Sequence, residues 1–478
     1  MVLRMILAAG CVIDSPALAQ EPDPEPRGSI GGKWVGAVAL PVGELPFSVI
    51  FEEADGVLSA TMDIPAQGAM GLPLTAVSHV HGRVHFELDA PIGLAAWDGA
   101  LEGDTIKGEF RQGVLTTTFS VSRADAGESE AEEPVPYGVE EVSFENGEIH
   151  LEGTLTLPEG TGPFPGVALI TGSGPQDRDE VVSGFPVFRV LSDHLTRQGI
   201  AVLRYDDRGV GGSTGSTPGS TTADFAGDAL AGLARLSAHP AVDPSRVGLV
   251  GHSEGAIVAA VAASRSGTVR FVVWLAGSTV PGTEVLYEQS AAIARASGVS
   301  EDRIERNTDF QRRLFAAVEA GEDLDAYREE LGVALREGFH ELTEEERGAI
   351  SDVETWVQSQ IDGQINRVET PWFRFFLTYD PVESLRGTRV PVLALFGGLD
   401  LQVVVDQNRP PLETALAANP DVTVEVFPRA NHLFQAATTG SPSEYGLLEQ
   451  HFVDGFLDRI SNWILVRFGG QQRRGPAP

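Results

Sequence analysis

From residue 166 onward the chain contains short, mostly apolar runs separated by segments with helical periodicity. The apolar runs are 166–170, 200–205, 247–250, 271–275, 392–396 and 422–427. Runs of this kind are typical of strands that are buried on both faces of a parallel sheet. Helical patterns lie between them at 188–198, 222–238 and 256–264. The alternation predicts an α/β fold with a doubly wound, mostly parallel sheet.

The alternation is interrupted between residues 275 and 392, where the chain is mostly charged and follows helical patterns at 301–330 and 343–366. A crossover between parallel strands needs only about a dozen residues. We therefore expect a helical cap, about residues 283–372, over the carboxyl edge of the sheet, where such sheets bind ligands. The aromatic residues at its end are expected either to line an apolar pocket or to pack into a core. They are Trp372, Phe373, Phe375 and Phe376.

Residues 31–123 have a different rhythm, because apolar and polar residues alternate in short segments. These segments are 33–40, 47–51, 58–64, 83–88, 105–110 and 116–121, with glycine, proline and aspartate between them. The pattern predicts a small antiparallel all-β domain, closed into a sandwich or barrel. His79, His81 and His85 lie in it without a fourth ligand or convergent carboxylates, so we favour strand-surface positions over a metal site.

The first nineteen residues resemble an export signal. Arg4 precedes an apolar run at 5–13, and Ala17-Leu18-Ala19 fits a cleavage site between small residues. We expect cleavage after Ala19 and a periplasmic or secreted protein, with a cytosolic amino terminus as the alternative. The only cysteine, Cys11, lies inside this signal. Cleavage would therefore exclude disulfides, thiol catalysis and cysteine-ligated metals, and lipid attachment at Cys11 is the weaker interpretation.

Two further segments separate the expected domains. Residues 20–30 begin with a charged, proline-rich spacer, and residues 124–136 are an acidic linker that ends in prolines. Such compositions are typical of linkers. The α/β domain is therefore expected over residues 137–470.

The charge balance excludes some partners. The chain has 34 basic and 68 acidic side chains, a formal net charge of −34. Such a surface repels phosphate backbones, so we expect no nucleic-acid partner. No uninterrupted apolar run reaches eighteen residues, so we expect no integral membrane segment.

A nucleophile pattern G-x-S-x-G occurs twice, around Ser213 and around Ser253. The motif needs a strand directly before the serine and a helix directly after it, because a sharp turn between them exposes the hydroxyl. Ser213 lies in a loop rich in glycine, serine and threonine. Ser253 follows the apolar run 247–250 and precedes a helical segment of small residues. Context therefore favours Ser253 as the nucleophile.

A serine nucleophile needs a base and an acid. In this type of fold the acid follows the serine along the chain, and the histidine comes last. His432 lies just after the run 422–427, whereas His340 falls in the cap and His451 in an amphipathic segment expected to be helical. Asp400 ends a short turn after the run 392–396, and Asp406 is the runner-up. We predict Asp400 as the acid that orients His432.

An oxyanion hole completes the predicted site. One backbone N–H follows the nucleophile, at Glu254, and a second comes from the loop after an earlier strand. That loop is Thr171-Gly172-Ser173-Gly174-Pro175, with the Ser173 N–H as the expected donor. It lacks the lysine of a phosphate-binding loop. The charged segments 177–180 and 206–208 are expected either to pair and brace this rim or to be solvated.

Together, several of these segments resemble a group of bacterial α/β-hydrolases. They are Thr171–Asp179 (TGSGPQDRD), Arg204–Gly209 (RYDDRG), Gly251–Gly255 (GHSEG), the stretch from Tyr379 to Asp400, and Asn431–Phe434 (NHLF). The group includes carboxylesterases of the EstD type and serine aminopeptidase-like hydrolases, many with a β-rich amino-terminal domain. The resemblance covers roughly residues 136–468 and implies Ser253, Asp400 and His432 as nucleophile, acid and base. It departs at Thr171, where a histidine often stands.

We therefore expect a serine hydrolase that cleaves carboxylic esters through an acyl-enzyme intermediate, with a small-molecule ester as substrate and no metal or organic cofactor. A peptidase acting on short peptides with the same triad is the nearest alternative, since the insertion has many acidic residues to bind an amine. A non-catalytic binding protein is the alternative from another class, and the ordered triad argues against it.

Overall fold

The structure is a computed structural model of the 478-residue chain. It describes residues 30–40, 43–54, 57–64, 69–80, 82–90, 93–112, 115–123, 135–340, 347, 350 and 352–469. The predicted export signal with Cys11 and its cleavage site, the spacer before residue 30 and most of the acidic linker lie outside these ranges. The chain divides into two compact units. One contains Val135–Glu322 and the chain from Val368 on, and the other contains the preceding β-rich segment and Asp323–Arg367.

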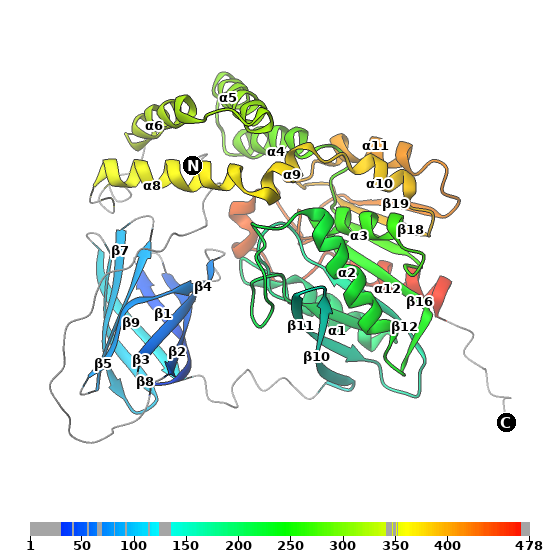
Figure 1. The fold of residues 1–478 in the computed structure, drawn as a ribbon, viewed down its shortest axis with the longest axis horizontal. Coiled ribbons are helices and arrows are strands. Elements are labelled where there is room, and N and C mark those ends of the chain that lie inside the picture. The colour runs from blue at the N-terminus through cyan, green and yellow to red at the C-terminus, as the bar shows by residue number, and fades with distance from the viewer. Residues whose placement is uncertain are drawn as a thin grey trace. The chain divides into compact units, whose positions relative to one another are not determined.

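The β-rich segment forms one antiparallel sheet of nine strands. They are β1 Gly32–Leu40, β2 Gly43–Ala54, β3 Val57–Ile64, β4 Ala69–Pro73, β5 Thr75–Val80, β6 Arg83–Ala90, β7 Gly93–Glu102, β8 Thr105–Gln112 and β9 Leu115–Arg123. Their order is β4-β3-β2-β1-β9-β8-β7-β6-β5. The strands at the two ends of this order, β4 and β5, are joined by Leu74 alone, whose N–H donates to the Ala60 carbonyl at 2.9 Å. The sheet therefore closes on itself as a barrel, which Figure 1 shows in blue.

Aromatic side chains fill the interior of this barrel. Phe86 stacks on Trp97 with ring centroids 5.2 Å apart, and Phe47, Phe51 and Phe119 pack around them. A small sheet cannot bury enough aliphatic surface by itself, and large rings supply most of the area that leaves water. This core belongs to the barrel and is separate from the two cores of the α/β unit.

The α/β unit is built on an eight-stranded sheet in the order β10-β11-β15-β12-β16-β17-β18-β19. The strands are β10 Gly138–Asn146, β11 Ile149–Leu157, β12 Phe164–Ile170, β15 Ala201–Tyr205, β16 Val242–His252, β17 Val272–Leu275, β18 Val392–Gly397 and β19 Val422–Phe427. The six strands from β15 to β19 in this order are parallel, and β11 runs antiparallel to both its neighbours. The sheet is therefore mixed, a refinement of the predicted mostly parallel sheet. A tight turn at 147–148 joins β10 to β11, and a two-residue hairpin imposes antiparallel pairing.

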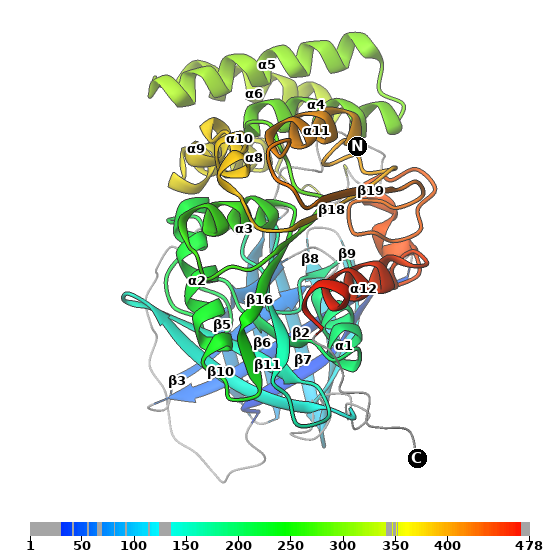
Figure 2. The same ribbon diagram turned by 90° about the vertical axis from the view of Figure 1, so that its right-hand side faces the viewer.

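Helices cover both faces of this sheet, because successive strand side chains point to opposite sides. On β12, Val167 and Leu169 pack with α1 Val187–Arg197 and α12 Phe456–Phe468, whereas Ala168 and Ile170 pack with the other face. The second layer consists of α2 Thr222–Ser237, α3 Glu254–Arg265, α10 Pro381–Gly387 and α11 Val405–Ala415. Figure 2 shows α1 and α12 on one side of the strands and α2 and α3 on the other.

The insertion between β17 and β18 is helical, as expected, but one of its predicted helical segments is divided into two helices. It contains α4 Gly282–Ala296, α5 Glu301–Ala320, α6 Asp325–Phe339, α8 Val353–Glu369 and α9 Pro371–Thr378. The helix predicted over 301–330 ends at Gly321, which has φ 68° and closes α5 in a left-handed cap. α6 and α8 are joined by ion pairs of Arg328 with Asp362 and Arg336 with Glu354. No helix within the described ranges is long and apolar enough to cross a membrane.

Candidate active site

Ser253 occupies the sharp turn between β16 and α3. Its backbone has φ 54° and ψ −119°, a conformation that non-glycine residues rarely adopt and that neighbouring structure must hold in place. The Ser253 N–H donates to the carbonyl of Leu275 on β17 at 2.8 Å. At Gly255 a Cβ would lie 2.2 Å from the carbonyl oxygen of Ile170, so only glycine lets the start of α3 approach β12 this closely. The turn exposes part of Ser253 at the carboxyl end of the sheet.

Asp400 and His432 meet at the same edge, each following its strand by a few residues. Asp400 Oδ2 lies 2.8 Å from His432 Nδ1, and the two residues are 3% and 5% exposed. The other carboxylate oxygen of Asp400 accepts the backbone N–H groups of Gln402 and Val403, both at 2.8 Å. The carboxylate is thus fixed by main chain, and His432 Nδ1–H is the donor to Oδ2. This arrangement leaves Nε2 of His432 as the acceptor that a general base needs.

The loop that carries His432 is shaped by polar contacts. Asn431 Oδ1 accepts the N–H groups of Leu433 and Gln435, at 3.0 and 2.9 Å, which bends the chain around His432. The hydroxyl of Tyr445, on the 3₁₀ helix η3 Pro442–Leu447, accepts from Gln402 Nε2 at 2.9 Å and from the His432 backbone. Burial above all raises the pKa of Tyr445, so it stays neutral. Sequence reasoning missed this tyrosine, since it lies thirteen residues beyond the histidine and outside any motif.

The loop after β12 lies against the serine turn. A Cβ on Gly172 would be 3.3 Å from Ser253 Cβ. The Gly172 N–H donates to Glu180 Oε1 at 2.7 Å, and the Thr171 hydroxyl donates to Asp207 at 2.8 Å. The Thr171 hydroxyl thus fixes this loop to Asp207. Ser173 follows on the exposed side of the loop.

Glu254, the first residue of α3, has a buried carboxylate with three hydrogen-bonding neighbours. It accepts from Thr222 Oγ1 on α2 at 2.7 Å and from Trp372 Nε1 on α9 at 3.1 and 3.0 Å. The side chain of Ser173 also contacts it. Burial raises the pKa of Glu254, and the bonds from Thr222, Trp372 and Ser173 counter this in part. The carboxylate therefore joins the cap helix α9, the loop after β12 and the serine turn.

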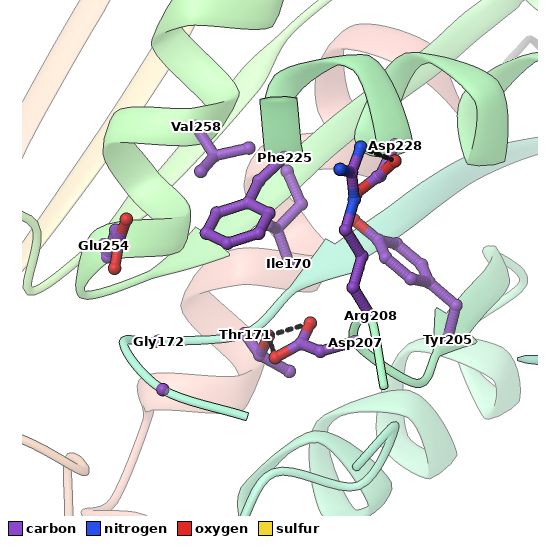
Figure 3. A pocket seen from close by; sticks show the side chains of 11 residues that line it. Ile170, Thr171, Gly172, Tyr205, Asp207, Arg208, Phe225, Asp228, Glu254 and Val258 are labelled. Atoms are coloured by element: carbon purple, nitrogen blue, oxygen red, sulfur yellow. Dashed lines mark hydrogen bonds and ion pairs between the residues drawn. The ribbon is translucent and has the colours of Figure 1, made fainter. Parts of the chain in front are cut away.

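A pocket opens beside this carboxylate. Its walls include Ile170, Thr171, Gly172, Gly174, Tyr205, Asp207, Arg208, Phe225, Asp228, Glu254 and Val258. Figure 3 shows Asp207 beside Thr171, Arg208 paired with Asp228, and Phe225 on the opposite wall. Burial raises the pKa of Asp207 well above its usual range, since desolvation disfavours the charged form. The pocket is thus lined by three carboxylates, by the guanidinium of Arg208 and by apolar side chains.

The charged segments around the loop after β12 are paired rather than solvated. Arg178 donates to both carboxylate oxygens of Asp206, at 3.1 and 2.7 Å, and its backbone N–H donates to Asp206 as well. Arg204 pairs with Asp179. Of the two expectations for these segments, bracing of the rim is the arrangement that is found.

The runner-up residues are placed elsewhere. Ser213 donates its hydroxyl to the Asp206 carbonyl at 2.9 Å and accepts the Glu152 N–H at 3.0 Å, so it fastens a loop to β11. Asp406 is exposed in the first turn of α11, and His340 caps the end of α6. The prediction of a helix around His451 is wrong. His451 lies in an irregular segment between η3 and α12, because α12 begins only after Gly455 adopts φ 81°.

The aromatic residues at the end of the insertion form α9. Trp372 and Phe373 are buried, and Phe373 packs against Phe315 of α5 with ring centroids 5.7 Å apart. A Cβ on Gly282 would lie 2.3 Å from the Phe376 carbonyl, so α4 begins directly against α9. These rings therefore pack the cap helices onto one another, while Trp372 also reaches Glu254.

Histidines of the barrel have local partners. His85 Nδ1 lies 2.8 Å from Asp98 Oδ1, and its Nε2 lies 3.3 Å from Glu87. His79 lies on β5, and His81 is outside the described residues. Across the part of the chain that the structure describes, no group of three or more histidine, cysteine, aspartate or glutamate side chains is arranged to hold a metal ion.

Comparisons with known proteins place this architecture in a family. The family model described as "Alpha/beta hydrolase family" matches residues 181–440, more than half of the chain. Esterase EstD from Thermotoga maritima is 28% identical over 343 residues, which cover 70% of this chain and 71% of that protein. Among solved structures, an esterase from Pyrococcus furiosus is 15% identical with a TM-score of 0.42, covering 70% of this chain and 93% of its own. A dienelactone hydrolase from Anabaena variabilis is 17% identical with a TM-score of 0.36, covering 70% and 98%. From the family match, the strand order and the serine turn, we conclude that the chain belongs to the alpha/beta hydrolase family.

Proposed function

We propose that this chain is a serine esterase that hydrolyses small carboxylic esters through an acyl-enzyme intermediate. Ser253 attacks the ester carbonyl while His432 Nε2 accepts the hydroxyl proton. Asp400 stabilises the imidazolium that forms. His432 then protonates the leaving alcohol, and in the second half of the cycle it activates a water molecule that releases the acid.

The backbone N–H groups of Ser173 and Glu254 are proposed to bind the oxyanion. Ser173 lies on the loop after β12 and Glu254 begins α3, and these two segments flank Ser253. Removal of one such donor typically costs about 3 kcal/mol of transition-state stabilisation. The side-chain contacts of Glu254 with Thr222 and Trp372 hold the start of α3 in place for this purpose.

The observation that carries the proposal is the 2.8 Å bond between Asp400 and His432 at the edge where the strained Ser253 turn also lies. Three strand ends supply the three groups, in the chain order typical of this family. The similarity to a relative named an esterase favours esters over other acyl substrates.

The test is hydrolysis of a series of short- to long-chain nitrophenyl esters and of aminoacyl and peptidyl anilides by wild-type protein and Ser253→Ala. We expect ester turnover that the substitution abolishes, with little turnover of anilides. Turnover of anilides that is lost in Ser253→Ala would assign the same residues to a peptidase. Activity that survives the substitution would remove Ser253 from the reaction.

We also propose that the protein is exported and loses its first nineteen residues, on the basis of the sequence Ala17-Leu18-Ala19. Amino-terminal sequencing of the protein recovered from the periplasm or medium tests this. The expected first residue is Gln20, and recovery of full-length protein in the cytosol would contradict it.

A further inference from the structure

A second buried pair of titratable side chains lies beside the proposed triad. His252, which immediately precedes Ser253, points its Nδ1 at Glu180 Oε1, 2.8 Å away. The two side chains are 3% and 1% exposed. Burying such a pair carries a large desolvation cost, and a pair of apolar residues is often as stable or more so. The pair is therefore expected to have a role besides stability, and the mechanism above does not use it.

The Glu180 end of the pair holds the loop after β12. Glu180 Oε1 accepts the N–H of Gly172, directly before the proposed oxyanion donor Ser173, at 2.7 Å. Space there is tight, because a Cβ on Gly172 would lie 3.2 Å from Glu180 Oε1 and 3.3 Å from Ser253 Cβ. Glu180 itself has φ 48°, and its N–H donates to the Asp177 carbonyl at 3.0 Å. The carboxylate thus fixes how far the loop stands from the serine turn.

The His252 end holds the loop that carries the base. His252 Nε2 lies 3.0 Å from the main-chain carbonyl oxygen of His432, and the two rings have centroids 4.8 Å apart. A carbonyl oxygen only accepts, so Nε2 of His252 carries a hydrogen and donates it. Since Tyr445 bonds to the His432 backbone as well, the base is held through its main chain in addition to the Asp400 contact on its ring.

The charge state of the pair follows from these contacts. Burial alone would lower the pKa of His252, but the Glu180 carboxylate and the bond to His432 outweigh it, and the pKa is raised. An imidazolium donates from both ring nitrogens at once, and such bonds to a carboxylate are the stronger kind. Asp400 is the other charged group that favours the cation.

We propose that Glu180 and His252 are positioning residues. They hold the loop after β12 and the loop that carries His432 at a fixed separation on either side of Ser253. The inference rests on the esterase function proposed above. Glu180 acts through the main chain of Gly172, and His252 acts through the main chain of His432, against whose ring it also packs. Because the arrangement matters most when charge develops on the oxyanion, loss of the pair lowers kcat more than it raises KM.

The first test compares Glu180→Ala with Glu180→Gln. In Glu180→Gln the side-chain oxygen can still accept the N–H of Gly172, so the contact to the loop after β12 survives although the charge that faces His252 is lost. We expect Glu180→Ala to lower kcat by about 10²-fold with KM within about twofold, and Glu180→Gln to recover most of it. Asp243→Ala is the matched control, since it removes a carboxylate paired with Arg246 at the opposite end of β16 and should leave kcat unchanged.

A second variant covers the case in which Glu180→Ala does not fold. Glu180→Met combined with His252→Leu replaces the buried pair by apolar side chains of similar volume, an exchange that is often neutral for stability. We expect this protein to fold, with some loss of stability because the Gly172 N–H and the His432 carbonyl lose a partner, and to show the same loss of kcat. Wild-type kcat in the folded double variant, or equal kcat values for Glu180→Ala and Glu180→Gln, would overturn the proposal.

The ring nitrogens of His252 give a readout that does not depend on turnover. In ¹⁵N spectra of wild-type protein we expect both nitrogens of His252 to be protonated near neutral pH, with the assignment taken from His252→Asn. In Glu180→Ala the two-proton signal should disappear. If the wild-type protein is inactive but shows this signal, only the esterase proposal is overturned. If His252 has only one protonated nitrogen in the wild-type protein, the ion pair with Glu180 is overturned.

Discussion

His432 Nδ1 and Asp400 Oδ2 lie 2.8 Å apart although 32 residues separate them in the chain. The contact is possible because β18 and β19 are parallel neighbours, so their carboxyl ends and the turns that follow meet at one edge. Since the second oxygen of Asp400 is taken by two backbone N–H groups, the carboxylate has a single orientation toward the imidazole. The tautomer of His432 is therefore set by the fold of the turn after β18.

Asp400→Asn should lower kcat by about 10³- to 10⁴-fold with little change in KM, because an amide no longer selects the tautomer with Nε2 as acceptor. Steady-state hydrolysis of a nitrophenyl ester measures this. Asp406→Asn is the matched control, since Asp406 is exposed on α11. A comparable loss in Asp406→Asn, or an unchanged kcat in Asp400→Asn, would contradict the assignment.

Ser213→Ala should retain wild-type kcat and lose stability. Its hydroxyl joins the Asp206 carbonyl to the Glu152 N–H, and an unpaired buried polar group costs about 1–3 kcal/mol. Urea unfolding together with ester hydrolysis separates the two effects. Loss of catalysis in a folded Ser213→Ala protein would show that the wrong serine motif had been chosen.

The strand ends that carry the proposed triad could be predicted from the sequence, because each follows a mostly apolar run. The runs before Ser253, Asp400 and His432 correspond to β16, β18 and β19. Residues that act from a loop onto another loop could not be predicted in this way. Glu180 lies in a charged segment for which the sequence left pairing and solvation equally open, and its carboxylate is buried against His252.

Some elements were missed for local reasons. The barrel strand β7 has the sequence GLAAWDGALE, in which alanine and glycine hide the alternation of apolar and polar residues. The helix predicted around His451 fails because an amphipathic pattern cannot distinguish a helix from a loop that packs Phe452 inward. The break at Gly321 could have been predicted, since glycine near a helix end commonly adopts the left-handed cap.

Gly255→Ala should destabilise the protein by about 1–3 kcal/mol or more, because the added methyl group would lie 2.2 Å from the Ile170 carbonyl oxygen. Gly267→Ala is the control, since a Cβ there meets nothing within 4 Å. Chemical denaturation of the two variants should show a large loss for the first and almost none for the second. Equal stabilities would mean that α3 does not pack as closely on β12 as the structure indicates.

Trp372→Phe should destabilise the protein more at high pH than at low pH. Burial raises the pKa of Glu254, so the folded state holds this proton to a higher pH than the unfolded state does, and stability falls as the pH rises between the two values. Without the indole N–H the charged form loses a donor that reaches both of its oxygens, and the folded pKa rises further. Unfolding at about pH 5 and about pH 8 measures the difference. Trp463→Phe, on α12, should show no such pH dependence.

Covalent labelling by a fluorophosphonate identifies the nucleophile itself, when the adduct is located by mass spectrometry of peptides from the wild-type protein and from Asp400→Asn. We expect one adduct, on Ser253, formed much more slowly in Asp400→Asn because His432 is then a poor base. An adduct on Ser213, or no adduct on any serine of the folded wild-type protein, would contradict the assignment of this turn as the nucleophile.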